Sequence, residues 1–203
     1  MNNHSVEETK ANWTPQTLKD MFKQSDDIQI FVHQYDESPS STVVLIYSEG
    51  TIDSSLISRT VLPELHALYR ENEEFVLHKG LMFGSLQLEP LQNKASEETL
   101  YEVIFEGSLV IFFPQLNTFL KVNISQIPGR TPEESSTEIS IKGPKDGFVE
   151  SIVVNVALIR KRIRSKSLCY DKFILGKRTK TKVGLLYFQD IILLRFWRKL
   201  SED

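Results

Sequence analysis

Cysteine is almost absent from this 203-residue chain, which contains Cys169 alone, so a disulfide within the chain is excluded. Long hydrophobic runs are missing too: the best one, IVVNVALI, is broken by Asn155 and is far shorter than the about 20 apolar residues of a membrane helix. The N-terminus, MNNHSVEETK, lacks the basic and apolar regions of a signal peptide. Together these absences favour a soluble intracellular protein in a reducing compartment.

The common catalytic and metal-binding motifs are also missing. The chain has no GxSxG, no phosphate loop and no GxGxxG, and its 4 histidines show no metal-ligand spacing. Cys169 begins a predicted strand without a nearby histidine, which favours a structural role over a nucleophile. Acidic pairs such as Glu97–Glu98 are adjacent in sequence, so their side chains point apart. The sequence therefore predicts no enzyme, no metal and no cofactor.

Charge of opposite sign is concentrated in two parts of the chain. Residues 1–140 contain 9 Lys and Arg against 21 Asp and Glu, a net charge of −12, whereas residues 141–203 contain 15 against 6, a net charge of +9. The run GKRTKTK (176–182) makes a small nucleic-acid-binding protein the alternative function, because phosphate binding grows with clustered Lys and Arg. The favoured interpretation is structural: basic residues at the end of a predicted helix complement its dipole, and those on a predicted hairpin keep its edge soluble.

Hydrophobic periodicity predicts an α/β fold in which helices accompany mixed sheets. Alternation in DIQIFVHQYD and the apolar run TVVLIYSEG indicate a pair of strands after a short helix capped by Thr14. SLVIFFP and TFLKVNI predict a second hairpin, preceded by a helix with a capping box at Ser96. CYDKFILGKRTKTKVGLLYF predicts a third hairpin. Asp53 is expected to cap another helix that kinks or restarts at Pro63.

An internal similarity suggests two related units. A shift of 140 residues aligns TVVLIY (42–47) with KVGLLY (182–187). Each segment is the second strand of a predicted hairpin, and each hairpin follows a predicted helix. We therefore expect two small α/β subdomains, each a helix–strand–strand–helix unit. The expected organisation is a mobile tail (1–13), an N-terminal subdomain (14–126), the turn-rich linker IPGRTPEESST (127–137) and a C-terminal subdomain (138–203).

GPKDGFVE (143–150) stands before the longest predicted helix. Phe148, Ile152, Val156, Ile159 and Ile163 recur at the helical period, and Asp146 is the expected N-cap, with Glu150 near the positive end of the helix dipole. The free backbone N–H groups of such a helix start also suit an anionic ligand such as an amino-acid carboxylate. Capping by Asp146 is the favoured interpretation, because a carboxylate cap competes with any bound anion.

The order of motifs in the last third resembles a known family. GR before a TPEE stretch, then GPKDGFVESIVVNVALIRKRIRS and FILGKRTKTKV, closely resemble the A subunit of the GerA-type spore germinant receptors from about Ile127 to Phe188. Upstream, SSLISRTVLPEL and the SLVIFF/TFLKV pair are similar to the rest of the same N-terminal domain.

The resemblance implies a role in a membrane complex. In the family, this domain precedes membrane helices, and the A subunit assembles with B and C subunits in the spore inner membrane, where nutrients such as amino acids, sugars or nucleosides trigger germination. The present chain, without membrane helices, is expected to be soluble and on the cytoplasmic side. Two mechanisms stay open: nutrient binding in a cleft between the subdomains, or a scaffold for partner subunits whose basic third rests near the anionic membrane surface. The matched positions are the candidate ligand-binding or interface residues: Arg130, Lys145, Asp146, Glu150, Asn155, Arg160, Arg162, Arg178 and Lys180.

The C-terminal end departs from the family. After FQDI, family members continue with a helix resembling PEILEEV, whereas this chain reads LLRFWRKLSED. A coding sequence for Pro-Glu-Ile-Leu-Glu-Glu-Val, translated one base later, spells Leu-Arg-Phe-Trp-Arg-Lys-Leu, which is Leu194 to Leu200. We therefore hypothesise that the sequence from about Ile191 onward is frame-shifted, which would explain why the second unit lacks its closing helix.

Overall fold

The computed structural model describes residues 13–91, 95–126 and 148–191 of the 203-residue chain. A six-stranded sheet and a two-stranded sheet are accompanied by helices, which confirms the predicted α/β class. The helices are α1 (Pro15–Met21), α2 (Leu62–Asn72), α3 (Glu97–Phe105) and α4 (Ile152–Arg162), with short helical turns η1 (Pro39–Ser41), η2 (Ile57–Val61) and η3 (Pro114–Leu116). The strands are β1 (Ile28–Gln34), β2 (Thr42–Ser48), β3 (Met82–Phe83), β4 (Leu86–Pro90), β5 (Ser108–Phe113), β6 (Thr118–Asn123), β7 (Leu168–Leu175) and β8 (Thr181–Phe188).

The larger sheet has the order β1-β2-β5-β6-β4-β3, with every neighbouring pair antiparallel. All six residues of β5 are buried, as a central strand covered on both faces requires. The predicted hairpin of β5 and β6 is present, with η3 at its turn. In the segment 75–91, which has no clean hydrophobic period, β3 and β4 form a short hairpin at the edge of the sheet.

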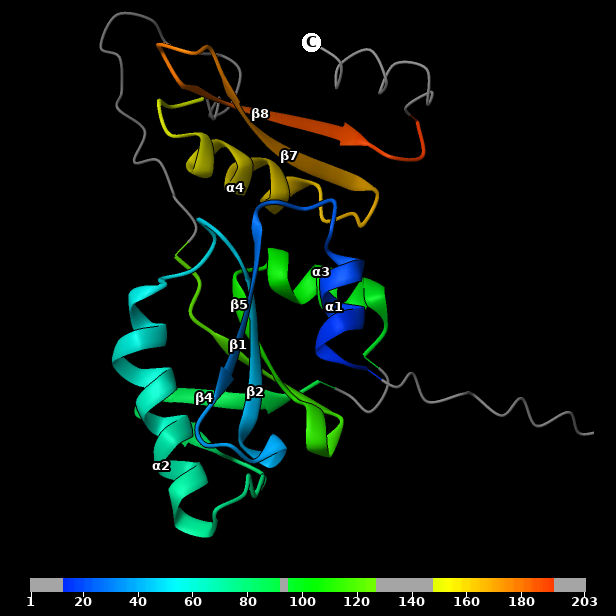
Figure 1. Ribbon diagram of the computed structural model, residues 1–203. Helices are drawn as coiled ribbons and strands as arrows, with labels where there is room; N and C mark the ends of the chain where they lie inside the picture. The colour runs from blue at the N-terminus through cyan, green and yellow to red at the C-terminus, as the bar shows by residue number, and fades with distance from the viewer. Residues whose placement is uncertain (1–12, 92–94, 127–147, 192–203) are drawn as a thin grey trace, which may run out of the picture.

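Helices cover both faces of this sheet and enclose two hydrophobic cores (Figure 1). On one face, η2 and α2 pack Val61, Leu65 and Tyr69 against residues of β2, β5 and β6. On the other face, α1 and α3 pack Leu18, Leu100 and Ile104 against the intervening residues of β2 and β5. Because neighbouring side chains of a strand point to opposite faces, β2 can contribute to both cores, and its Val43, Val44, Leu45 and Ile46 are all fully buried.

Two of the predicted helix starts before α4 are confirmed. The Ser96 side chain accepts from the Thr99 backbone N–H at 3.2 Å, and Thr14 caps α1 with Pro15 at its first position. At Pro63 the helix does not restart: the π-helical turn η2 runs directly into α2 with Val61 and Leu62 both in the right-handed helical conformation, and the Leu62 N–H still donates within the helix to the Ile57 carbonyl. Trp13, expected to belong to the N-terminal tail, packs edge to face on Phe119.

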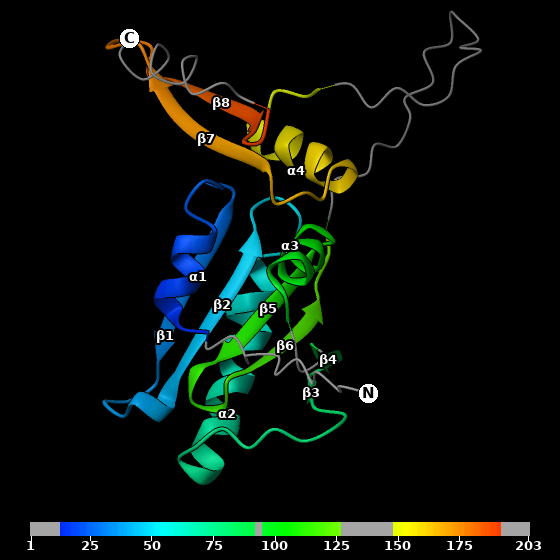
Figure 2. The ribbon, with the colours of Figure 1, turned by 90° about the vertical axis from the view of Figure 1, so that its right-hand side faces the viewer.

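The smaller sheet pairs β7 with β8 and lies beside α4 at one end of the six-stranded sheet (Figure 2). Its register repeats that of the first hairpin: Ile28 pairs with Ser48, and a shift of 140 residues carries this pair onto Leu168 and Phe188. Each hairpin follows a helix, so three successive elements of the proposed repeat are present in both units. The expected closing helix of the second unit lies outside the described residues. So do the linker 127–137 and the residues after Ile191 that the frame-shift hypothesis concerns.

The start of α4 differs from the prediction. The helix begins at Ile152 and its N-cap is Ser151, whose hydroxyl accepts from the Val154 N–H at 3.4 Å. Phe148, expected on the apolar face, precedes the helix and is 72% exposed. Asp146 is therefore not the N-cap of this helix, and Asp146 itself lies outside the described residues. A serine cap is used here because the four residues after Gly147 (148–151) are not helical and Ser151, the last of them, has extended backbone directly before the first helical turn.

Candidate functional site

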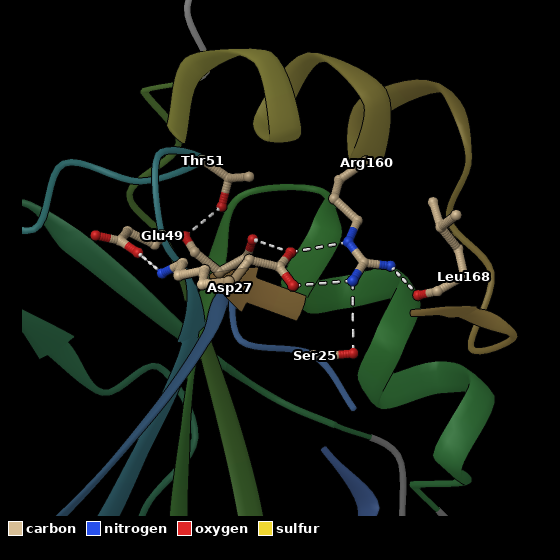
Figure 3. A network of polar contacts seen from close by, with 8 residues as sticks. Ser25, Asp27, Glu49, Thr51, Arg160 and Leu168 are labelled. Carbon is tan, nitrogen blue, oxygen red and sulfur yellow. Dashed lines mark hydrogen bonds and ion pairs between the residues drawn. The ribbon is translucent and has the colours of Figure 1, made fainter. Parts of the chain in front are cut away.

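The most distinctive polar site lies where α4 and the β7–β8 hairpin meet the six-stranded unit. We call it the junction and define it by Ser25, Asp27, Arg160 and Leu168 (Figure 3). Ser25 and Asp27 stand in the loop between α1 and β1, Arg160 is in the last turn of α4, and Leu168 is the first residue of β7. All four are buried, although Arg160 is separated from Asp27 by 133 positions in the sequence.

Arg160 binds Asp27 through two hydrogen bonds. Its Nε donates to Asp27 Oδ2 at 2.8 Å and its Nη2 to Oδ1 at 2.9 Å, the paired geometry that makes Arg–carboxylate contacts strong and directional. Its Nη1 donates to the Leu168 carbonyl oxygen at 2.5 Å, and the guanidinium lies 4.3 Å from the centre of the Phe105 ring. With 0% of the residue exposed, the guanidinium is held entirely by the protein.

Hydroxyl groups complete the surroundings of this ion pair. Ser48 Oγ donates to Asp27 Oδ2 at 3.5 Å, and Arg160 Nη2 also reaches Ser25 Oγ at 3.5 Å. Removing two charges from water costs several kcal/mol each, so a buried ion pair is tolerated only when its remaining donors and acceptors are also satisfied. In this pair each nitrogen of the Arg160 guanidinium and each carboxylate oxygen of Asp27 has a hydrogen-bond partner. Loss of either residue therefore leaves a buried charge without compensation.

Exposed ion pairs surround the buried one. Arg164 meets Glu106 at 2.7 Å and Lys172 meets Glu49 at 2.6 Å. Lys166 meets Glu98 at 2.6 Å, and this hydrogen bond lowers the pKa of the Glu98 carboxyl and raises the pKa of the Lys166 amine. In each pair the base belongs to the C-terminal part and the acid to the N-terminal part. The opposite net charges of the two parts are thus complementary across the junction.

Backbone hydrogen bonds also join the two units. The Tyr170 N–H donates to the Gln24 carbonyl at 2.9 Å, and the Asp26 N–H donates to the Tyr170 carbonyl at 2.9 Å, which makes a short parallel bridge. The Lys172 N–H donates to Asp26 Oδ2 at 2.7 Å. Strand β7 is therefore attached to the α1–β1 loop through its main chain.

The first turn of α4 is also closely fitted. Asn155 Oδ1 accepts from the Val149 N–H at 2.8 Å and its Nδ2 donates to the Val149 carbonyl at 2.7 Å, so one side chain holds the segment that enters the helix. Gly50, after β2, lies against Val153: a Cβ placed on Gly50 would be 2.6 Å from Val153 Cγ1. Only glycine permits this approach, because the φ of Gly50 is also +80°.

Six of the nine candidate residues lie in the described part of the chain, and they do not gather in one place. Arg160 is in the junction and Asn155 one turn earlier in α4, whereas Glu150 is exposed before the helix and Arg162 is exposed at its end. Arg178 and Lys180 lie in the exposed turn between β7 and β8. The other three, Arg130, Lys145 and Asp146, lie outside the described residues. That these positions bind a ligand or form an interface stays a prediction.

Sequence reasoning missed Asp27, Ser25 and Phe105. Asp27 is one of two adjacent aspartates before β1, and nothing in the local sequence distinguishes it from its exposed neighbour Asp26. The one available signal was the charge asymmetry of the chain, which indicates that the two parts attract each other without naming the pair.

Catalytic chemistry is not evident at the junction. In the described ranges, no three His, Cys, Asp or Glu side chains are grouped as a metal ion requires. Cys169 is buried, and burial raises the pKa of its thiol, which disfavours the reactive thiolate. Burial likewise raises the pKa of Tyr101 to about 12, and its hydroxyl donates to the Met21 carbonyl at 2.9 Å.

Comparison with known proteins identifies the family. The family model described as Bacillus/Clostridium GerA spore germination protein matches residues 16–201. The chain belongs to the GerA family. Spore germination protein XA of Bacillus anthracis is 33% identical over 180 residues, which cover 86% of this chain and 36% of that protein. Spore germination protein B1 of Bacillus subtilis (strain 168) is 27% identical over 177 residues, with the same coverage of 86% and 36%. The chain thus spans about a third of the length of these GerA relatives.

A solved structure supports the fold. The N-terminal domain of the A subunit of the Bacillus megaterium spore germinant receptor GerK3 superposes with a TM-score of 0.62 over 92% of this chain and 68% of that one, at 18% identity. The GerA chain therefore has the fold of that domain. Among its described residues, no helix is both long and apolar enough to cross a membrane.

Proposed function

We propose that this chain is the N-terminal part of a germinant receptor A subunit and that it transmits or supports the nutrient response that triggers spore germination. Its partners would be the B and C subunits and the membrane part of its own subunit. It would act at the spore inner membrane, on the cytoplasmic side. Membership in the GerA family and the fold shared with the GerK3 domain support this assignment.

The observation that carries the mechanism is the buried Arg160–Asp27 pair. It connects α4 to the loop before β1, so a change in the position of one unit must either break this pair or move the other unit with it. Separating the units would also break the main-chain hydrogen bonds of Tyr170 with Gln24 and Asp26, so the two units are expected to move together. A rigid connection of this kind suits the transmission of a signal between a partner on one unit and a partner on the other.

The same geometry disfavours nutrient binding at the junction. An arginine that recognises a nutrient carboxylate needs free donors, whereas three nitrogens of Arg160 already donate to Asp27, Leu168 and Ser25. Gly50 and Val153 are also in direct contact, at the first turn of α4. We therefore favour transmission or scaffolding over nutrient binding at the junction.

The test is Asp27→Asn in the chromosomal gene, in spores that lack other germinant receptors. The control is Glu49→Gln, which also removes one carboxylate charge but from an exposed pair. Asp27→Asn should alter the rate of nutrient-triggered germination by at least about 10-fold, in line with the loss of a buried pair, and Glu49→Gln by less than about 2-fold. An unchanged nutrient response in Asp27→Asn spores that contain normal amounts of the protein would overturn the mechanism.

A thermal-shift panel of amino acids, sugars and nucleosides on the chain separates the two mechanisms. Transmission or scaffolding predicts no shift with any of them. A specific and saturating rise in the melting temperature would instead assign nutrient binding to this chain, since a ligand at a hundred times its Kd adds about 2.7 kcal/mol of stability.

A further inference from the structure

The turn between β7 and β8 combines positive charge with exposed aliphatic surface. We call residues 174–183 the hairpin tip. It contains no acidic residue, and all ten residues are exposed to solvent. Both views show it projecting beyond α4, away from the six-stranded sheet (Figures 1 and 2). The basic residues of the tip are Lys177, Arg178, Lys180 and Lys182.

The charges of the tip differ from the other charges of the same unit. Arg164, Lys166 and Lys172 pair with acids of the six-stranded unit across the junction. Within the part of the chain that the structure describes, no ion pair involves the four basic residues of the tip. The acids nearest the junction, such as Glu49 and Glu98, are already engaged. Among the described residues, the positive charge of the tip is thus uncompensated and available to an external anion.

Exposed aliphatic side chains accompany these charges. Ile174 is 68% exposed, Leu175 54% and Val183 36%. Ile174 lies opposite Lys182 in the strand pairing, so an apolar and a basic side chain are neighbours on the hairpin. Large aliphatic residues at the solvent end of a two-stranded hairpin cost solubility, and they gain free energy only against another apolar phase.

We propose that the hairpin tip binds the surface of an anionic phospholipid bilayer. Its Lys and Arg side chains would lie among the headgroup phosphates, while Ile174 and Leu175 enter the boundary between headgroups and acyl chains. Basic residues close to such a surface contribute about 1 kcal/mol each, a factor of about 5, and buried apolar area adds to this attraction. The proposal rests on the proposed function, since it names the segment that would contact the membrane surface, and it is argued from the charge and exposure of the tip.

The aliphatic residues favour a bilayer over a nucleic acid. A nucleic-acid surface stacks bases on exposed aromatic rings, but Tyr170 and Tyr187 of this hairpin are buried and Phe173 is half-buried. Phosphate contacts with a nucleic acid would use the basic residues and leave Ile174 and Leu175 in water. A bilayer would contact both the basic residues and the two aliphatic side chains.

The experiment is flotation of the 203-residue chain with vesicles of phosphatidylglycerol and phosphatidylcholine. The chain should float with mixed vesicles and stay behind with pure phosphatidylcholine. The double change Arg178→Gln/Lys180→Gln should weaken partition about 30-fold. The matched control Lys19→Gln/Lys23→Gln removes the same charge from exposed positions on and just after α1 and should leave partition unchanged. Circular dichroism of each variant verifies that it is folded.

The change Ile174→Ser/Leu175→Ser tests the lipid-specific part. It should weaken partition at least about 10-fold at high salt, where electrostatic attraction is screened. Absence of flotation with anionic vesicles overturns the proposal, and so does equal weakening by the tip and α1 variants. Tighter binding to DNA or RNA that Ile174→Ser/Leu175→Ser leaves intact would replace it with a nucleic-acid site, and self-association lost on Arg178→Gln/Lys180→Gln would replace it with a contact between copies.

Discussion

The hairpins β1–β2 and β7–β8 have the same register and very different surroundings. Each follows a helix, and a shift of 140 residues carries the pair Gln34–Thr42 of the first onto Ile174–Lys182 of the second. Yet β2 also pairs with β5 and lies between two hydrophobic cores, whereas β7 and β8 form a sheet of two strands. Val43 is fully buried, while Val183, its equivalent after the shift, is 36% exposed.

The difference shows that a local pattern can specify a hairpin without specifying how it is stabilised. An isolated two-stranded hairpin is at best marginally stable in water. The second hairpin is therefore expected to depend on α4 and on the junction, where Arg160, Tyr170 and Lys172 attach it to the six-stranded unit. Its free end is then left exposed, and that end is the hairpin tip.

The largest effect is expected from Arg160→Met, which breaks the attachment and leaves Asp27 buried without its partner. We expect a loss of about 3–5 kcal/mol in the free energy of unfolding, measured by urea denaturation of the chain. The double variant Arg160→Met/Asp27→Leu should recover much of this loss, because apolar replacements of a buried pair are often tolerated. A loss below about 1 kcal/mol for the single variant would mean that the hairpin does not depend on the junction.

A smaller effect is expected from Gly50→Ala, which pushes the two units apart at α4. The new Cβ would meet Val153 at 2.6 Å, and alanine is strained at the φ of +80°. Overpacking and strain together predict a loss of about 2–4 kcal/mol in a thermal or urea melt. Gly80 is the matched control, since it has a φ of +79° and nothing within 4 Å of a Cβ; Gly80→Ala should cost about 1 kcal/mol. Equal losses in the two variants would show that α4 moves away from residue 50 without a cost in stability.

The comparison of the two hairpins is sharpest at their equivalent valines. Val43→Thr buries a hydroxyl in the core beside α2 and should cost about 1–3 kcal/mol. Val183→Thr places the same hydroxyl at an exposed position and should change the stability by less than about 0.5 kcal/mol. The melting temperatures of the two variants measure these two changes in stability. Similar losses at both sites would mean that the second hairpin is covered in solution by a surface that the described residues do not supply.

Much of the fold follows from local patterns. The alternation of β1, the apolar run of β5 and the caps Thr14 and Ser96 each satisfy their rule within a few residues, so their elements could be predicted. The start of α4 could not. Asp146 and Ser151 are both good N-caps by type, and the choice between them depends on the contact of the distant Gly50 with Val153 as well as on the local bonds of Asn155 to Val149.

The sequence by itself determined the family, the succession of helices and strands, and the opposite charges of the two parts, because motif order, hydrophobic period and composition are properties of the chain. Which charges meet was decided only by the tertiary structure. Arg160 and Lys161 are adjacent basic residues, but one is fully buried on Asp27 and the other faces solvent. The partner lies 133 positions away, and only the packing of α4 on the six-stranded unit brings the two side chains together. Desolvation and hydrogen-bond geometry then make this one pair the connection between the units.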